Sequence, residues 1–89
     1  MTAREKLQEY DFDEEVLLLD EELYVDSLVG VVMLPGLRAV YDFNKMVEEL
    51  VQKKGLSAEE AADYVSYNEV RGCSYFGDKS PIIFDPLEY

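Results

Sequence analysis

Carboxylates are the groups in this sequence whose number and spacing could do chemistry. The chain has 89 residues, with 20 acidic and 8 basic residues. The densest acidic cluster comprises Asp11, Asp13, Glu14, Glu15, Asp20, Glu21 and Glu22. Carboxylates at this density could bind Ca²⁺ or Mg²⁺, but their spacing lacks the glycine and the closing glutamate of a calcium-binding loop. The cluster is otherwise a binding surface for a basic partner or a solvated face, and both interpretations stay open.

The residue types needed for most enzymatic chemistry are missing. The chain has no histidine, which is the commonest general base and metal ligand. Its one cysteine, Cys73, therefore has no histidine to generate a thiolate, and its glycines form no phosphate-binding loop. A single cysteine also excludes an intramolecular disulfide and suits a reducing cytoplasm. We expect no enzymatic activity, no metal and no cofactor.

The charge restricts the partners. A net charge of −12 disfavours direct binding to nucleic acid, whose phosphates would be repelled, and docking to an anionic membrane. A compact acidic surface can instead imitate a phosphate backbone and occupy the basic groove of a nucleic-acid enzyme. Tyr64 and Tyr67 are three residues apart. On a helix they would form either a recognition patch or the edge of the core.

The elements that must position these residues begin with an acidic segment. Residues 1–26 hold ten acids and two bases, a net charge of −8. We predict a helical or irregular start, and then a short apolar segment, residues 16–19, that packs on the core of a compact domain formed by residues 27–89.

Hydrophobic patterns divide residues 27–89 into five elements. Residues 28–34 and 37–41 read as a β-hairpin around Pro35 and Gly36. Helices are predicted over 43–54, capped by Asp42 and Gly55, and over 58–70, and a strand over 81–84. On the second helix the residues predicted to face inward are Ala58, Ala61, Ala62, Val65 and Val70, and those predicted to face outward are Glu59, Asp63, Ser66 and Glu69. The order β-β-α-α-β predicts an α+β domain with two helices on a small antiparallel sheet.

Several motifs follow one another in residues 28–86: Arg38-Ala-Val-Tyr-Asp42, Met46-Val-Glu-Glu-Leu50, Ser57-Ala-Glu-Glu-Ala61, Tyr67-Asn68, Arg71 and Pro81-Ile-Ile83. In this combination the chain resembles a group of small acidic proteins encoded by bacteria and their phages. Where the group often has Ala-Leu-Pro after the arginine, this chain has Gly72-Cys73-Ser74. The resemblance implies a phage or mobile-element origin and supplies no catalytic residue.

The sequence-based hypothesis is a non-enzymatic phage protein that acts in the cytoplasm of the host cell. It would inhibit a nucleic-acid-handling defence enzyme through an acidic, nucleic-acid-mimicking surface, and an anti-CRISPR protein is its most specific form. The acidic cluster named above would make the contacts, with Tyr64 and Tyr67 as anchors. One alternative is a homodimeric structural or regulatory module that buries residues 28–34. Another is a carboxylate-based metal-dependent enzyme or Ca²⁺ sensor.

Overall fold

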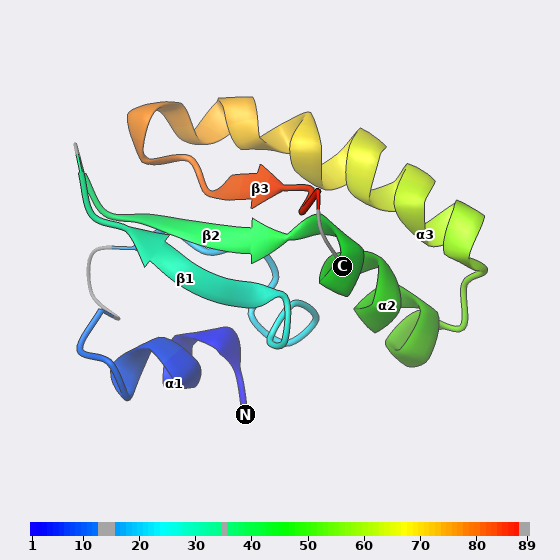
Figure 1. The fold of residues 1–89 in the computed structure, drawn as a ribbon, viewed down its shortest axis with the longest axis horizontal. Helices are drawn as coiled ribbons and strands as arrows, with labels where there is room; N and C mark the ends of the chain where they lie inside the picture. The colour runs from blue at the N-terminus through cyan, green and yellow to red at the C-terminus, as the bar shows by residue number, and fades with distance from the viewer. Residues whose placement is uncertain (13–15, 35, 88–89) are drawn as a thin grey trace.

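The computed structural model describes residues 1–12, 16–34 and 36–87. The strands are β1 (Leu28–Val32), β2 (Arg38–Asp42) and β3 (Ile82–Phe84). The helices are α1 (Ala3–Gln8), α2 (Phe43–Lys54) and α3 (Ala58–Tyr64), and α3 continues as a π-helix, η1 (Val65–Val70), before the 3₁₀ turns of η2 (Gly72–Lys79). The predicted α+β class and the order β-β-α-α-β are confirmed. Figure 1 shows α1 beside β1, and α3 with η1 along the opposite side of the sheet, beyond β3.

The sheet has the strand order β1-β2-β3 and is mixed. β1 and β2 form the predicted antiparallel hairpin, with Val31 opposite Ala39; Pro35 of the predicted turn lies outside the described residues. β3 pairs with β2 in parallel, with Val40 opposite Ile82, so the prediction of an antiparallel sheet was wrong for this strand. The chain passes through α2, α3 and η1 between β2 and β3, and a helical crossover of this kind returns a strand in the same direction.

Helix α2 has the predicted bounds and caps. The Asp42 side chain accepts hydrogen bonds from the backbone N–H groups of Asn44 and Lys45. Gly55 ends the helix in the left-handed conformation, with φ 70°, which a glycine adopts at little cost. Met46 and Leu50 are buried on the face toward the core.

The second helix is correct in extent, but the assignment of its faces was wrong in part. Ala61 and Val65 are buried as predicted, whereas Ala58 and Val70 are exposed. Glu69 was placed outward, yet it is half-buried. It follows Val65 by four residues and therefore shares its face, whereas Val70 is turned away.

The acidic N-terminal segment contributes directly to the core. Ala3, Leu7, Val16, Leu23 and Tyr24 are all buried. They pack with Leu28, Ala39, Tyr41, Met46, Leu50, Ala61 and Val65 in one cluster. The predicted packing of residues 16–19 is confirmed for Val16, which is buried, and for Leu18 and Leu19, which pack against the core, whereas Leu17 is exposed. Carboxylates in this segment are thus attached to a backbone that is fixed by its apolar neighbours.

Candidate functional site

Residues 16–27, here called the acidic loop, are held to the domain through their backbone by three cations. The Arg4 guanidinium donates to the Val16 carbonyl (3.1 Å). Lys6 Nζ donates to the carbonyls of Val25 (2.9 Å) and Leu28 (2.7 Å), at the end of the loop and the start of β1. Lys53 Nζ donates to the carbonyls of Glu22 (3.0 Å) and Leu23 (2.9 Å). These cations bind peptide carbonyls, so most of the charge on the loop's carboxylates stays uncompensated.

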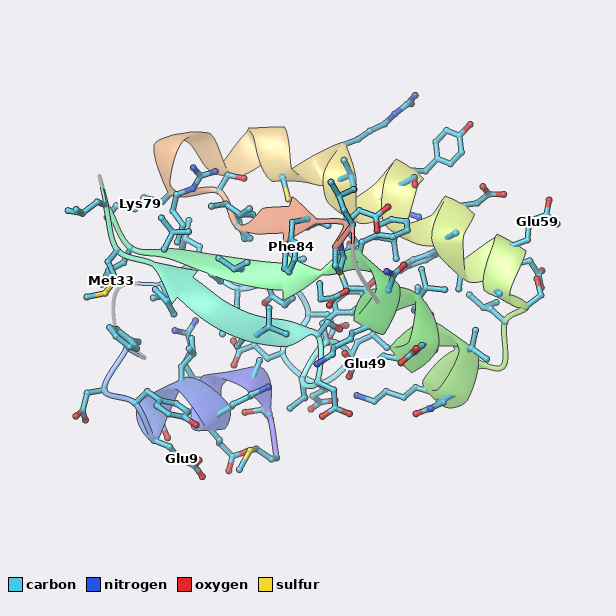
Figure 2. All side chains as sticks on the ribbon, viewed as in Figure 1. Glu9, Met33, Glu49, Glu59, Lys79 and Phe84 are labelled. Carbon is cyan, nitrogen blue, oxygen red and sulfur yellow. The ribbon has the colours of Figure 1, made fainter. Side chains whose placement is uncertain are left out.

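Glu49 lies on α2 (Figure 2) and anchors the end of the same loop. It is only 3% exposed. Its carboxylate accepts from the backbone N–H of Asp26 (3.1 Å) and of Ser27 (2.8 Å), from the Ser27 hydroxyl, and from Lys53 Nζ (2.9 Å). Burial alone would raise the pKa of Glu49. The hydrogen bonds from Ser27, Lys53 and Asp26 outweigh burial and hold its pKa below the ordinary value. Glu49 is therefore a buried, ionised group that fixes the loop.

The loop displays its own carboxylates to solvent. Asp20, Glu22 and Asp26 are exposed. Glu21 is half-buried and has Arg4 at 3.8 Å, and its carbonyl accepts from the N–H of Ala3 (2.7 Å). A surface of this kind is ordered before it meets a partner, which lowers the entropic cost of binding.

A cavity of about 350 Å³, here called the notch, opens between the acidic loop and the helix formed by α3 and η1. Its lining residues are Leu18, Leu19, Asp20, Leu23, Tyr24, Tyr64, Asn68, Glu69 and Gly72. Two of the sequence-predicted binding residues, Asp20 and Tyr64, meet here. Glu69, which the sequence reading placed outward, is the second carboxylate of the notch.

Asp20 is fixed by its own turn. Its Oδ1 accepts from the N–H groups of Glu22 and Leu23, both at 3.1 Å, as an Asx turn does. Its carbonyl accepts from the N–H of Tyr24 (3.2 Å), which places the Tyr24 ring behind the turn. The carboxylate is thereby held at the notch in one orientation.

Tyr24 is completely buried, and its hydroxyl has no hydrogen-bond partner among the described residues. Burial raises the pKa of Tyr24 far above its ordinary value, and nearby Glu69, Tyr64 and Asp20 raise it further. The hydroxyl interacts electrostatically with the Glu69 carboxylate, but the two groups do not reach hydrogen-bond geometry. A buried polar group left in this state is costly to the free protein.

Glu69 also opposes folding at neutral pH. Burial raises the pKa of Glu69; interaction with the Tyr24 hydroxyl lowers it in part, and the charge of Asp20 raises it. Because the folded pKa lies above the unfolded one, the folded state binds protons more tightly, and stability decreases as the pH rises through the folded pKa.

We therefore expect Glu69→Gln to raise the free energy of unfolding at neutral pH by up to about 1 kcal/mol, since solvent screens a half-exposed group. The difference between variant and wild type should disappear below the unfolded pKa of about 4.3. Urea denaturation of both proteins at the two pH values measures this. A variant less stable than wild type at neutral pH would contradict the assignment.

The remaining predicted site residues do not join the notch. Asp11 is exposed after α1, in a left-handed conformation with φ 63°, and Asp13, Glu14 and Glu15 lie outside the described residues. Glu21 and Glu22 lie on the acidic loop, beside Asp20. Tyr67 is 63% exposed, and the Arg71 guanidinium lies 4.8 Å from the centre of its ring. Tyr64 lines the notch and Tyr67 is not among its lining residues, so the predicted patch of Tyr64 and Tyr67 stays a prediction.

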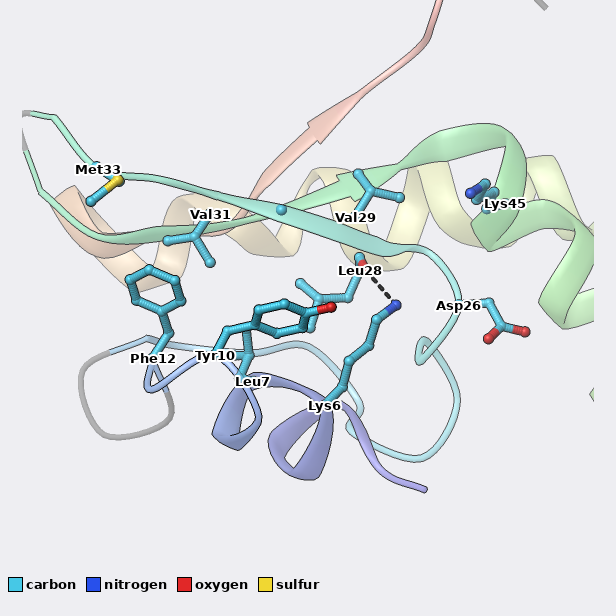
Figure 3. A pocket seen from close by; sticks show the side chains of 11 residues that line it. Lys6, Leu7, Tyr10, Phe12, Asp26, Leu28, Val29, Val31, Met33 and Lys45 are labelled. Atoms are coloured by element: carbon cyan, nitrogen blue, oxygen red, sulfur yellow. Dashed lines mark hydrogen bonds between the residues drawn. The ribbon is translucent and has the colours of Figure 1, made fainter.

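A second and larger cavity, about 580 Å³, lies between α1 and β1 and is here called the groove. Figure 3 shows Leu7, Tyr10 and Phe12 on the α1 side, with Val31 of β1 pointing toward them; Val29 of β1 also lines the groove. Lys6 also lines it, and its bond to the Leu28 carbonyl crosses one end. The sequence predicted the apolar strand but not the groove. The second wall of the groove is formed by residues of α1 and the turn after it, which are distant from β1 in the sequence.

Within residues 1–12, 16–34 and 36–87, no three His, Cys, Asp or Glu side chains are grouped so as to hold a metal ion. In the same residues, no helix combines the length and the apolar character that a membrane span needs. Burial raises the pKa of the Cys73 thiol, with hydrogen bonding to Ser80 acting in the opposite direction. Cys73 is thus a protonated thiol at neutral pH.

Comparison of the chain with protein-family models, with curated proteins and with solved structures gave no match.

Proposed function

We propose that this protein is a non-enzymatic inhibitor that binds the basic surface of a nucleic-acid-handling protein through its acidic loop. The observation that carries the proposal is the way in which the loop is fixed. Arg4, Lys6 and Lys53 bind its backbone carbonyls, and the exposed carboxylates of Asp20, Glu22 and Asp26 are left for a partner. A solubilising face would need the charge but not the fixed backbone.

Several cations of the chain contact neutral groups, although Arg4 also pairs with Glu21 and Lys53 with Glu49. Besides the three cations that hold the acidic loop, Arg38 donates to the Ser80 carbonyl (2.7 Å) and Arg71 lies over Tyr67. The net charge of −12 therefore acts mainly on solvent and on approaching molecules. A field of this size accelerates association with a positively charged groove and competes with phosphates for it.

A CRISPR effector complex is the partner class proposed first, in the cytoplasm of the bacterial host. Such a complex has a strongly basic channel for nucleic acid. The resemblance of residues 28–86 to small phage-encoded proteins supports this setting, which is an argument by analogy.

The proposal is tested by measuring inhibition of target-DNA cleavage by a purified CRISPR effector. Glu22→Lys combined with Asp26→Lys is expected to weaken inhibition roughly tenfold or more, because repulsion replaces attraction at the contact. Glu48→Lys combined with Asp63→Lys is the matched control, since it changes the net charge equally at exposed helix positions. Equal inhibition by the two double variants would contradict a role for the acidic loop.

A homodimer through β1 is the second candidate, and the groove favours it. β1 is an edge strand; Val29 within it is 44% exposed, and Met33 and Leu34 just after it are 63% and 85% exposed. An edge of this composition can pair with its copy across a twofold axis. The pairing would start beyond Leu28, because Lys6 occupies the carbonyl of that residue.

Light scattering across a concentration series tests the dimer. If β1 pairs with its copy, the mass should rise to that of a dimer, and Val31→Lys should return it to a monomer because a buried charge would oppose the pairing. A monomer at every concentration would remove this candidate. Val40→Lys, on the adjoining strand, is not a suitable control because Val40 lies inside the sheet.

A further inference from the structure

We propose that the notch binds the guanidinium group of an arginine side chain supplied by a protein partner. This inference rests on the proposed function, because it names the side chain through which a basic partner would be recognised. The notch combines Asp20 and Tyr24 of the acidic loop with Tyr64, Asn68 and Glu69 of α3 and η1, and the inference can fail separately because Glu69 lies outside that loop.

The charged groups of the notch are both acceptors. Asp20 and Glu69 contribute carboxylates, and the Asn68 amide uses its Nδ2 to donate to the Tyr64 carbonyl (3.1 Å), which leaves Oδ1 as an acceptor. No Lys or Arg is among the residues that line it. A ligand that satisfies such a site must carry several N–H donors and a positive charge, and a guanidinium has five donors and no acceptor.

Tyr24 gives the independent indication of a missing ligand. Its hydroxyl is fully buried at the wall of the notch and has no hydrogen-bond partner in the described part of the chain. The hydroxyl can donate to Glu69 after a small movement and still accept one bond through its oxygen. The oxygen is closed off from the notch in the free protein; the same movement would open it to an entering N–H group, which removes a cost that the free protein carries.

The shape and the apolar walls favour arginine over lysine. A volume of about 350 Å³ is at the small end for ligand cavities and suits one long side chain. Leu18, Leu19 and Leu23 would cover the methylene groups, and the Tyr64 ring, 42% exposed, offers a face for stacking. A guanidinium is more weakly hydrated than an ammonium group and stacks on aromatic rings, so it enters such a site at lower cost.

The test titrates the isotope-labelled full chain with a capped arginine amide and follows backbone amide shifts by NMR. Saturable shifts are expected at Asp20, Asn68 and Glu69. A capped lysine amide should bind several-fold more weakly, and a capped citrulline amide, which has the same shape without the charge, should cause no shift there. Absence of saturation with arginine, or equal shifts with citrulline, would overturn the proposal.

Glu69→Gln is the decisive variant, because it is expected to fold at least as stably as wild type. It should weaken arginine binding about tenfold or more, as loss of a charged hydrogen-bond acceptor does. Glu59→Gln, at an exposed position on α3, should bind as wild type does. Unchanged binding by Glu69→Gln would overturn the proposal.

The outcomes separate this inference from the proposed function. Suppose that Glu69→Gln abolishes arginine binding and that the Glu22→Lys/Asp26→Lys variant inhibits as well as wild type. This result would support arginine binding in the notch and contradict inhibition through the acidic loop. Inhibition that depends on Glu22 and Asp26 but not on Glu69 would contradict the binding of a partner arginine in the notch. The acidic loop would then remain as the binding surface.

Discussion

Replacement of Glu49 by alanine is expected to lower the free energy of unfolding by about 3–5 kcal/mol, because three donors lose their acceptor at about 1–3 kcal/mol for each buried one. Without the carboxylate, the backbone N–H groups of Asp26 and Ser27 and the Ser27 hydroxyl lose their acceptor. Lys53 also loses its counter-charge. Urea denaturation at neutral pH measures the change, and a loss below about 1 kcal/mol would show that the network does not hold the fold.

Glu49 also makes the free energy of unfolding depend on pH, and the direction of this dependence follows from its lowered pKa. The folded pKa of Glu49 is lowered, so its contribution is present above the unfolded pKa of about 4.3 and is lost as the pH falls through the folded pKa. Glu49→Gln keeps the length and one acceptor but does not titrate. Wild type should therefore be more stable than this variant at neutral pH, and the difference should shrink at about pH 3. A difference that stays constant between the two pH values would contradict the ionised state of Glu49.

Tyr41→Ala, made alone in the wild-type protein, is expected to lower the free energy of unfolding by about 3–5 kcal/mol, because it empties the centre of the core. Tyr41 is completely buried on β2, and its ring meets that of Tyr24 edge to face, with 6.3 Å between centres. Its hydroxyl accepts from the N–H of Leu19 (3.1 Å). The ring thus joins the sheet to the wall of the notch.

Tyr41→Phe separates these two roles. It keeps the ring but leaves the Leu19 N–H without its acceptor, so we expect a loss of only about 0.5–1.5 kcal/mol. Hydrogen exchange should become faster at Leu19 while the amides of α2 keep their relative protection. If Tyr41→Phe were as destabilising as Tyr41→Ala, the hydroxyl and not the packing of the ring would be the dominant contribution.

Local signals in the sequence were sufficient to predict the regular elements that have clear ends. The bounds of α2 follow from its apolar repeat with Asp42 before it and Gly55 after it, and the Ser57–Glu60 capping box starts α3. The parallel direction of β3 was missed. Only three residues of that strand pair with β2, and the prediction counted strands without following the direction imposed by the helices between them.

The site required information that a sequence pattern does not contain. Asp20 and Tyr64 were predicted as contacts, but nothing in the spacing indicated that they meet across the notch. Glu69 was detectable, because Ala61, Val65 and Glu69 repeat every four residues on one helix face; its charge led to the outward assignment. Glu49 could not be paired from sequence, since its partners Asp26 and Ser27 lie more than twenty residues away and donate through their backbone.

The most direct test of the central claim, that the acidic loop binds a basic partner, is capture of CRISPR effector complexes by the tagged protein at low and then high salt. Wild type and the Glu48→Lys/Asp63→Lys control should retain a basic effector at low salt and release it as salt screens the charges. The Glu22→Lys/Asp26→Lys variant should retain much less. Retention that is equal in all three proteins, or that persists at high salt, would contradict binding through the carboxylates of the loop.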